Sequence, residues 1–421
     1  MSVPMTQSPA PATPRSPWPA EGVCRVPAWI YTDPDLFAQE METFHHGATW
    51  NYVGLECELP TPGSFQRGFV GTRPIIVTRD LEGEIHVLEN RCAHRGAPVC
   101  WAQRGEAKDL TCPYHQWAYD LSGDLQGIPF MRGAPRPNPG MPRDFDKAQH
   151  GLHKFRVHRH NGVIWATDDA STPGFEDYVG PDVLRFLNRV FTGRPLRLLG
   201  YSRQSIPCNW KLYFENSRDP YHATLLHAFF TTFGIYRADA KFRVTPYPGG
   251  HEVIYSHFDA EARNVRSDLT DQMKTLKDGF TLEDMSVVTP VDEFHDGLIS
   301  SLQVFPGLFV QQHGNILALR HILPKSPGET DLSWTYFGYA DDDEAMQRRR
   351  LAQGNLVGPA GYVSLDDSEV LAQMQQVAAG YPDSVQVVEM GGRDNVEPAD
   401  TAITETLIRA FYVHYRQHMG I

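Results

Sequence analysis

The sequence lacks long apolar runs, an excess of basic residues and a cysteine framework, and each absence excludes a class of protein. No stretch approaches the roughly 20 apolar residues of a membrane-spanning helix. The N-terminus lacks the basic segment and apolar core of a secretory signal, so we expect a cytoplasmic protein. A net charge of −13 argues against nucleic acid and anionic membranes as partners, because both attract basic surfaces.

Six cysteines are few for 421 residues, and most of them show no regular spacing. This usage predicts a reducing compartment and no disulfide bonds. The thiols that we expect only in the core or on the surface are Cys24, Cys57, Cys100 and Cys208.

The composition is that of an ordinary globular protein, with 41% hydrophobic and 21% charged residues, and the length predicts two or three domains. Residues 1–45 begin with an arm rich in Pro, Ser and Ala, which Trp18 can anchor. They continue in a helix that Asp33 caps and that begins at Pro34. We expect this segment to pack on the largest domain.

Residues 46–160 contain short β-branched runs separated by turns, which predicts an all-β domain with hairpins at 75–88 and 119–125. Residues 161–421 mix helices and strands without regular βαβ units. The predicted fold class is therefore α+β, with an antiparallel sheet flanked by helices in this second domain. The expected strands are 197–206, 303–310, 315–323 and 331–339, and the expected helices are a run that ends at Phe233, 345–353 and 401–418.

One cysteine and one histidine occur together at each of two nearby turns of the all-β domain. The first pair is Cys92 and His94, and the second is Cys112 and His115. Two thiolates and two imidazoles suit either tetrahedral zinc or a Rieske [2Fe–2S] cluster, in which one iron binds both cysteines and the other both histidines. The mixed pairs favour the cluster, because zinc sites usually take like ligands from each turn.

A second constellation consists of Asp219, His222 and His227. Asp219 and His222 share a helix face, whereas His222 and His227 are about 140° apart on an ideal helix. The two histidines can bind one metal only where the helix ends or bends. With one distant carboxylate they would form the facial triad of non-haem iron oxygenases. The candidate carboxylates are Asp366 and Asp367, whose alternative role is to cap a helix.

The motifs CAHRG and CPYHQW, NWKLYFEN and DPYHATLLH, and GPAGYVSLDD occur in this order. Together they resemble the large (α) subunit of Rieske non-haem iron aromatic-ring-hydroxylating oxygenases, from about Trp18 to the C-terminus. The segments NWKLYFEN, HATLLHAFFTTF, LSWTYFGYADD and TETLIRAFYVHYRQHMG most resemble the branch that acts on terephthalate, salicylate or anthranilate. The resemblance implies a Rieske domain at 46–160 and a catalytic domain at 161–421.

The resemblance also implies a role for each candidate residue. Asp219 would be the bridging acid between His222 and the cluster ligand His115 of a neighbouring subunit. The implied cluster ligands are Cys92, His94, Cys112 and His115, and the implied ligands of a mononuclear Fe(II) are His222, His227 and Asp367.

The partners that the resemblance implies are further copies of the chain, a small β subunit and an electron donor. The α subunits would form a head-to-tail trimer within an α3β3 assembly. Electrons from NAD(P)H would arrive through a reductase, with or without a ferredoxin, and O2 would be the second substrate.

Two arginines are candidate contacts for a substrate carboxylate. Strand alternation places Arg320 on an apolar face, where it needs an anion that is either an internal carboxylate or that of a substrate. Arg409 follows Glu405 by four residues, as in a surface ion pair, and the resemblance implies that both arginines contact carboxylate. Ile254 stands where a small polar residue is expected in a terephthalate enzyme, which leaves an ortho-substituted benzoate open.

We therefore expect the large subunit of a terminal oxygenase that hydroxylates a monocyclic aromatic carboxylate of the terephthalate, salicylate or anthranilate type. Two alternatives stay open. One is an O-demethylating Rieske monooxygenase that acts as a homotrimer, and the other is a zinc-stabilised binding protein without redox chemistry.

Overall fold

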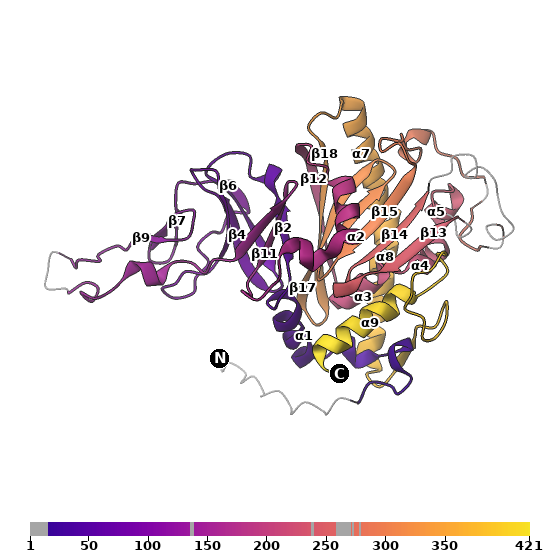
Figure 1. The fold of residues 1–421 in the computed structure, drawn as a ribbon, viewed down its shortest axis with the longest axis horizontal. Helices are drawn as coiled ribbons and strands as arrows, with labels where there is room; N and C mark the ends of the chain where they lie inside the picture. Colours follow the sequence, from indigo (N-terminus) through magenta and orange to yellow (C-terminus); the bar gives the residue numbers. More distant parts are fainter. Residues whose placement is uncertain (1–15, 135–138, 237–239, 258–270, 272, 278) are drawn as a thin grey trace, which may run out of the picture.

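Two β-rich bodies lie side by side in the computed structural model of the chain, and helices cover the second body (Figure 1). The structure describes residues 16–134, 139–236, 240–257, 271, 273–277 and 279–421. Most of the predicted N-terminal arm, residues 1–15, lies outside the described residues. Within the described part of the chain, no helix is both long enough and apolar enough to cross a membrane.

The first body, indigo and purple in Figure 1, consists of small antiparallel sheets. Its strands are β2 (Asn51–Leu55), β3 (Ser64–Val70), β4 (Arg73–Arg79), β5 (Ile85–Glu89), β6 (Arg104–Glu106), β7 (Leu110–Thr111), β8 (Ala118–Tyr119), β9 (Leu125–Gly127), β10 (Arg156–His160) and β11 (Val163–Thr167). The predicted hairpins are present as β4–β5 and β8–β9. β10 and β11 also form a hairpin, so this body continues to Thr167, past the predicted boundary at residue 160.

The second body is built on a seven-stranded antiparallel sheet. In spatial order its strands are β12 (Leu196–Ile206), β18 (Glu329–Tyr339), β17 (Ile316–Ser326), β16 (Leu308–His313), β15 (Leu298–Val304), β14 (Glu252–His257) and β13 (Phe242–Pro246). The prediction of one strand at 303–310 is wrong. Residues 305–307 form the turn between β15 and β16, and the turn signal of Pro306 and Gly307 lies hidden within a long apolar run.

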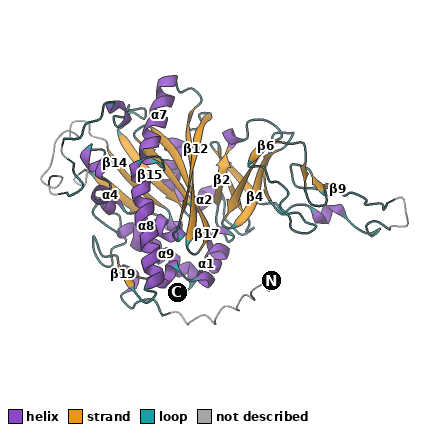
Figure 2. Cartoon of the chain, turned by 180° about the vertical axis from the view of Figure 1, so that it is seen from behind, coloured by secondary structure: helices purple, strands orange, loops and turns teal. Residues whose placement is uncertain are grey.

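Different helices bury the two faces of this sheet. The helices are α1 (Pro34–Glu40), α2 (Phe175–Val190), α3 (Trp210–Asn216), α4 (Pro220–Leu226), α5 (Ala228–Thr232), α7 (Glu344–Val357), α8 (Tyr362–Gly380) and α9 (Thr406–Met419). Leu317 and Leu319 pack against α2 on the face that is in front in Figure 1. Ile316 and Ala318 pack on the opposite face with residues of α3, α8 and α9, and α8 and α9 lie in front in Figure 2. This alternation along β17 is the one that the sequence predicts.

The N-terminal segment packs on the second body. Asp33 caps α1, because its Oδ1 accepts hydrogen bonds from the first free backbone N–H groups of the helix. The strand β1 (Arg25–Pro27) pairs with β19 (Val385–Val387). The ring centroid of Trp18 lies 5.5 Å from that of Tyr412 in α9, so Trp18 anchors the described end of the arm.

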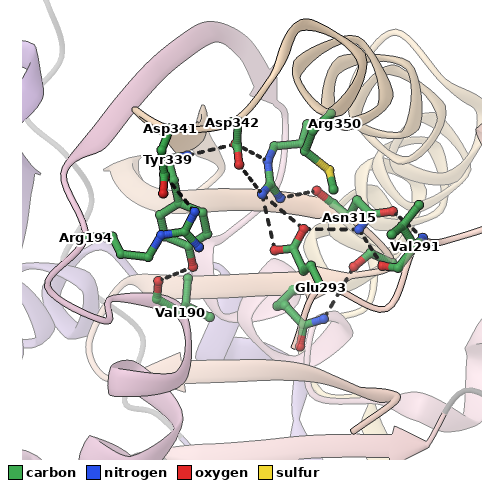
Figure 3. A network of polar contacts seen from close by, with 12 residues as sticks. Val190, Arg194, Val291, Glu293, Asn315, Tyr339, Asp341, Asp342 and Arg350 are labelled. Atoms are coloured by element: carbon green, nitrogen blue, oxygen red, sulfur yellow. Dashed lines mark hydrogen bonds and ion pairs between the residues drawn. The ribbon is translucent and has the colours of Figure 1, made fainter. Parts of the chain in front are cut away.

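A buried ion-pair network holds α7 on the sheet (Figure 3). The guanidinium of Arg350 lies 2.8 Å from Asp342 and 3.0 Å from Glu293. Its Nη1 donates to the backbone carbonyl of Asn315, whose side-chain amide donates to the carbonyl of Val291. The network therefore joins α7, the turn after β18 and the loop before β15 in one rigid unit.

Candidate metal centres and substrate cavity

The two turns that contain Cys92 and Cys112 have the same backbone geometry. The N–H of Gly96 donates to the carbonyl of Cys92, and the N–H of Gln116 donates to the carbonyl of Cys112. These donors have positive φ angles of 74° and 57°, respectively. In both turns the cysteine N–H also donates to a carbonyl five positions on. The turns thus share one backbone structure, in which the histidine follows the cysteine by two positions in the first turn and by three in the second.

The four predicted cluster ligands come together where the two turns meet in the first body. Cys92 and Cys112 are buried, whereas His94 is exposed and His115 half-exposed. The imidazole centroids lie 4.6 Å apart, and the hydroxyl of Tyr119 lies 3.2 Å from Sγ of Cys92. Two buried thiols and two outward imidazoles fit a Rieske cluster, in which the cysteines would hold one iron and the histidines the other.

The helix that contains His222 ends immediately before His227. α4 stops at Leu226, and His227 has φ −88° and ψ 93°, outside the helical region, before α5 begins. The spacing of the two histidines requires this break if they bind one metal. Their Nε2 atoms lie 3.4 Å and 3.2 Å from Oδ1 of Asp367, and the ligand atoms of all three residues lie within 4.8 Å of one another. The structure therefore brings the predicted triad together.

Asp367 is the member of the aspartate pair that faces Nε2 of both histidines. It is buried in α8, whereas the side chain of Asp366 is 37% exposed. Neither residue caps the helix, because the N-cap position is Gly361. The alternative role as helix caps is therefore wrong for both.

Each histidine has a further carboxylate beside its outer nitrogen. Oδ2 of Asp219 lies 3.4 Å from Nδ1 of His222, and Oδ2 of Asp366 lies 3.4 Å from Nδ1 of His227. A carboxylate at this nitrogen keeps the proton there and leaves Nε2 free to bind a metal. Asp219 also accepts a hydrogen bond from the backbone N–H of Tyr221, so the same side chain begins α4 and orients a ligand.

Asn216 also belongs to this site, although the sequence alone does not predict it. Its Nδ2 lies 3.1 Å from Oδ1 of Asp367 and 3.3 Å from Nε2 of His222. The side-chain amide therefore lies beside the atoms that would bind the metal. Its only signal in the sequence is its position at the end of NWKLYFEN.

Negative charge dominates the surroundings of the triad. Burial alone would lower the pKa of His222, but Asp219 and Asp367 outweigh it and raise this pKa to about 10. Burial would raise the pKa of Asp367, yet its contacts with His222 and His227 hold this pKa below its usual range. Both shifts indicate a field that favours positive charge at the centre. Two imidazoles and one carboxylate fit Fe(II) in this field.

A cavity of about 90 Å³ adjoins the triad. Its floor is the face of the seven-stranded sheet that also contains Ile316 and Ala318. β15 and β16 contribute side chains from alternate positions, which is why these point the same way. The floor combines polar and apolar side chains, among them Ile254, Ser301, Phe309, Gln311, His313 and Arg320.

Arg320 lies on this floor, as the sequence predicts. Its Nε and Nη2 donate to Oε1 of Gln311 at 3.0 Å and 2.6 Å, and its Nη1 lies 3.2 Å from the hydroxyl of Tyr213. The guanidinium carbon lies 4.5 Å and 4.2 Å from the ring centroids of Phe309 and Trp334 on the neighbouring strands. Neutral acceptors and aromatic faces therefore surround this cation within the described structure.

The structure does not bring Arg409 to the cavity. It is fully buried in α9, and its Nε and Nη1 donate to the backbone carbonyls of Asn395, Val388 and Met390. The predicted surface pair with Glu405 is wrong because Arg409 is not at the surface. The described cavity lining does not include Arg409, since its side chain ties α9 to the segment before it.

Comparison with protein families matches both parts of the chain. Residues 49–138 match the Rieske [2Fe-2S] domain, and residues 194–421 match the ring hydroxylating alpha subunit (catalytic domain). The Rieske match decides between the two metals that the cysteine and histidine pairs allow, in favour of the [2Fe–2S] cluster over zinc.

Three curated relatives align with nearly the whole chain. The large oxygenase component of salicylate 5-hydroxylase from Ralstonia sp. is 43% identical and aligns over 97% of this chain and 98% of its own. The anthranilate 1,2-dioxygenase large subunit of Burkholderia cepacia is 41% identical, over 96% and 95% of the two chains. Subunit alpha 2 of the terephthalate 1,2-dioxygenase terminal oxygenase component from Comamonas sp. is also 41% identical, over 96% and 97%.

Among solved structures, naphthalene 1,2-dioxygenase from Rhodococcus sp. bound to indole has a TM-score of 0.76 over 94% of both chains. Its sequence identity is 22%, so this likeness concerns the fold. The matched catalytic domain, the full-length relatives and the two metal centres lead to one assignment. The chain belongs to the ring-hydroxylating oxygenase α-subunit family, whose members combine a Rieske [2Fe–2S] cluster with a mononuclear iron.

Proposed function

We propose that this protein is the large subunit of a terminal oxygenase that hydroxylates a monocyclic aromatic carboxylate with O2. Electrons come from NAD(P)H through a reductase, with or without a ferredoxin. The observation that carries the proposal is Arg320, which is only 8% exposed and has no carboxylate partner among the described residues. Burial of an unpaired cation is unfavourable, so a substrate carboxylate would complete its surroundings.

The size and lining of the cavity support a single aromatic ring. Its volume of about 90 Å³ is of the same order as the roughly 150 Å³ of an engineered cavity that holds benzene. Phe309, whose ring centroid lies 4.5 Å from the guanidinium carbon of Arg320, and Ile254 both offer apolar surface within this cavity. The names of three relatives refer to salicylate, anthranilate and terephthalate, which are all monocyclic aromatic acids.

The residues of the chain have separable tasks in this reaction. Arg320 holds the carboxylate, and the apolar walls hold the ring and exclude water. The mononuclear iron supplies the centre at which O2 is activated, and the cluster supplies the electrons. Asn216 and Asp219 hold the metal ligands in place beside the ring.

We further propose that the chain forms a head-to-tail trimer within an assembly that also contains a small β subunit. In this trimer Asp219 is the bridging acid between neighbouring copies of the chain. Two observations support this role. Asp219 contacts the outer nitrogen of His222, and its side chain is 18% exposed. His115 is half-exposed on the other body, so it can contact a second copy of the chain.

The proposal is tested by O2 uptake with the holoenzyme, its reductase and a panel of acids. The panel contains benzoate, its 2-hydroxy, 2-amino and 2-halo derivatives, and the phthalates. We expect at least one acid to stimulate O2 uptake and to yield a ring-hydroxylated product. Product analysis distinguishes dihydroxylation, monohydroxylation and O-demethylation. The proposal fails if none of these acids stimulates uptake while both metal centres are loaded.

A further inference from the structure

A continuous chain of polar side chains crosses the cavity floor from Arg320 to Ser301. Gln311 accepts from Arg320, its Nε2 lies 3.3 Å from Nδ1 of His313, and Nε2 of His313 lies 2.7 Å from Oγ of Ser301. The four residues come from the adjacent strands β17, β16 and β15, and Ser301 lies directly opposite Gln311 in the strand register. The chain therefore links two separate points of the same cavity.

The direction of every hydrogen bond in this chain is fixed by Arg320. A guanidinium can only donate, so the atom of Gln311 that faces it must be the carbonyl oxygen. The amide nitrogen of Gln311 then faces His313 and donates to Nδ1. Because Nδ1 must accept, the ring proton of neutral His313 is on Nε2, which donates to Oγ of Ser301.

The charge state of His313 agrees with this arrangement. Burial lowers its pKa to about 3, and the positive charge of Arg320 acts in the same direction. A neutral imidazole has one donor and one acceptor, as the chain requires. The second polar point of the cavity is therefore uncharged.

In this chain of hydrogen bonds Ser301 acts only as an acceptor, so its hydroxyl proton is not used. Oγ accepts from His313, and no second partner of Oγ is present among the described residues. Ser301 is 7% exposed and lines the cavity, beside Ile254 on the next strand. Its O–H can therefore donate to a molecule in the cavity, and its second lone pair can accept from the same molecule.

We propose that Ser301 is a specificity-determining residue that binds a hydroxyl group on the ring of the aromatic acid. The inference rests on the proposed function, since it needs a ring carboxylate at Arg320. A hydroxyl group can both accept from and donate to Ser301. A second carboxylate on the ring would be buried beside Ser301 and His313, which are both uncharged and cannot balance its charge. Arg320 is the single Arg or Lys in the described cavity lining. The preferred substrate is therefore a hydroxybenzoate rather than a dicarboxylate.

Two of the residues act through Ser301. His313 and Gln311 do not need to touch the substrate; they are positioning residues that orient the Ser301 hydroxyl. Their effect on specificity should therefore vanish once this hydroxyl is removed.

The test compares kcat/KM of the holoenzyme for benzoate, the three hydroxybenzoates and terephthalate. The wild type should prefer one hydroxybenzoate to terephthalate. S301A should lower kcat/KM for that isomer about tenfold more than for benzoate, the size of one neutral hydrogen bond. S301C keeps the volume but donates weakly and should give an intermediate loss. H313A should show a similar loss of discrimination, and S301A/H313A should lose no more than S301A alone.

The matched control is S300A, on the same strand but in the adjacent position, which faces away from the cavity. It should leave the ratio between substrates unchanged, and cluster absorbance confirms folding of each variant. The inference is overturned if S301A and S301C change benzoate and hydroxybenzoates equally, or if terephthalate is preferred by the wild type. Failure of the proposed function is a different result, in which the wild type oxidises none of these acids.

Discussion

Oδ1 of Asp367 lies 3.2 Å from Nε2 of His227, although the two residues lie 140 positions apart in the sequence. The contact depends on the end of α4 at Leu226, because a continuing helix would turn the His227 ring away from His222. It also depends on how α8 is rotated about its own axis. This rotation directs the Asp367 side chain into the metal site and the Asp366 side chain toward Nδ1 of His227. Metal binding is therefore sensitive to each aspartate in a different way.

The aspartate pair gives the first prediction. D367N removes a ligand and should lower Fe(II) affinity roughly 100-fold or more, whereas D366N removes only an orienting contact and should lower it about 10-fold. Iron analysis after dialysis measures both effects, and the [2Fe–2S] absorbance should persist in each variant. Equal iron loss in the two variants would contradict the distinction between ligand and orienting residue.

Asp219 gives the second prediction, because it contacts His222 without facing the triad. D219N and D219A should keep the cluster and, like D366N, lower Fe(II) affinity by no more than about 10-fold, yet reduce turnover to near background even when the iron is restored. Single-turnover experiments measure product per reduced cluster and test whether electrons reach the iron. Loss of the cluster, or a far greater loss of iron than in D366N, would show that Asp219 has a structural role instead of the bridging one.

Arg320 gives the third prediction. R320Q should raise the Kd and KM for the aromatic acid about 10- to 100-fold, because a hydrogen bond to a charged group contributes roughly 1.5–3 kcal/mol. R409Q is the matched control, since Arg409 is buried but its described contacts are backbone carbonyls outside the cavity. It should lower thermal stability and leave KM unchanged. A rise of KM in R409Q alone would reverse the two assignments.

The sequence predicts most of the fold because β-branched runs, turns and strand alternation are local signals. The prediction fails where the local residues indicate a different structure from the one that forms. α2 was not predicted, since Gly180 and Pro181 interrupt its pattern and Gly180 has a non-helical φ of 76°. The turn at 305–307 was missed because apolar residues continue on both sides of it.

The geometry of the site is also only partly predictable from local signals in the sequence. The break between His222 and His227 follows from their spacing alone, once one metal is assumed. The choice between Asp366 and Asp367 does not, because neighbouring helical residues differ by 100° and only the packing of α8 decides which one faces inward. The spacing of four residues between Glu405 and Arg409 shows only that the two share one side of a helix. It does not show which segments cover that side, so it cannot predict that Arg409 is buried.

Lys211 and Glu40 give the fourth prediction, as both side chains are fully buried and their charged atoms lie 2.6 Å apart. Glu40 also accepts from Nε1 of Trp210, so the pair joins α1 to α3. K211M should destabilise the protein by about 3–5 kcal/mol, because it leaves a buried carboxylate without a cation. The double variant E40Q/K211M should recover much of this loss. Chemical unfolding followed by tryptophan fluorescence measures both, and an additive double variant would argue against direct pairing.

Glu215 gives the fifth prediction, which concerns pH. Burial raises the pKa of Glu215 to about 7, although Tyr412 and Tyr31 donate hydrogen bonds to it and lower this value in part. The fold thus binds the proton more tightly than the unfolded chain does. The resulting stabilisation is complete below the unfolded pKa of about 4.5 and is lost as pH rises through about 7. A shift of this size corresponds to about 3 kcal/mol.

E215Q imitates the protonated side chain and should keep this stabilisation at all pH values. Its unfolding free energy relative to the wild type should therefore rise between about pH 4.5 and 7 and then level off. Buried histidines also make the unfolding free energy depend on pH, in the opposite sense to Glu215. Because both proteins contain them, their contribution cancels when E215Q is compared with the wild type. Glu252 has a pKa raised to about 7 by burial, so E252Q should show a rise of the same sign at a second, independent position. A pH-independent difference for E215Q would mean that Glu215 has the same pKa in the folded and the unfolded protein.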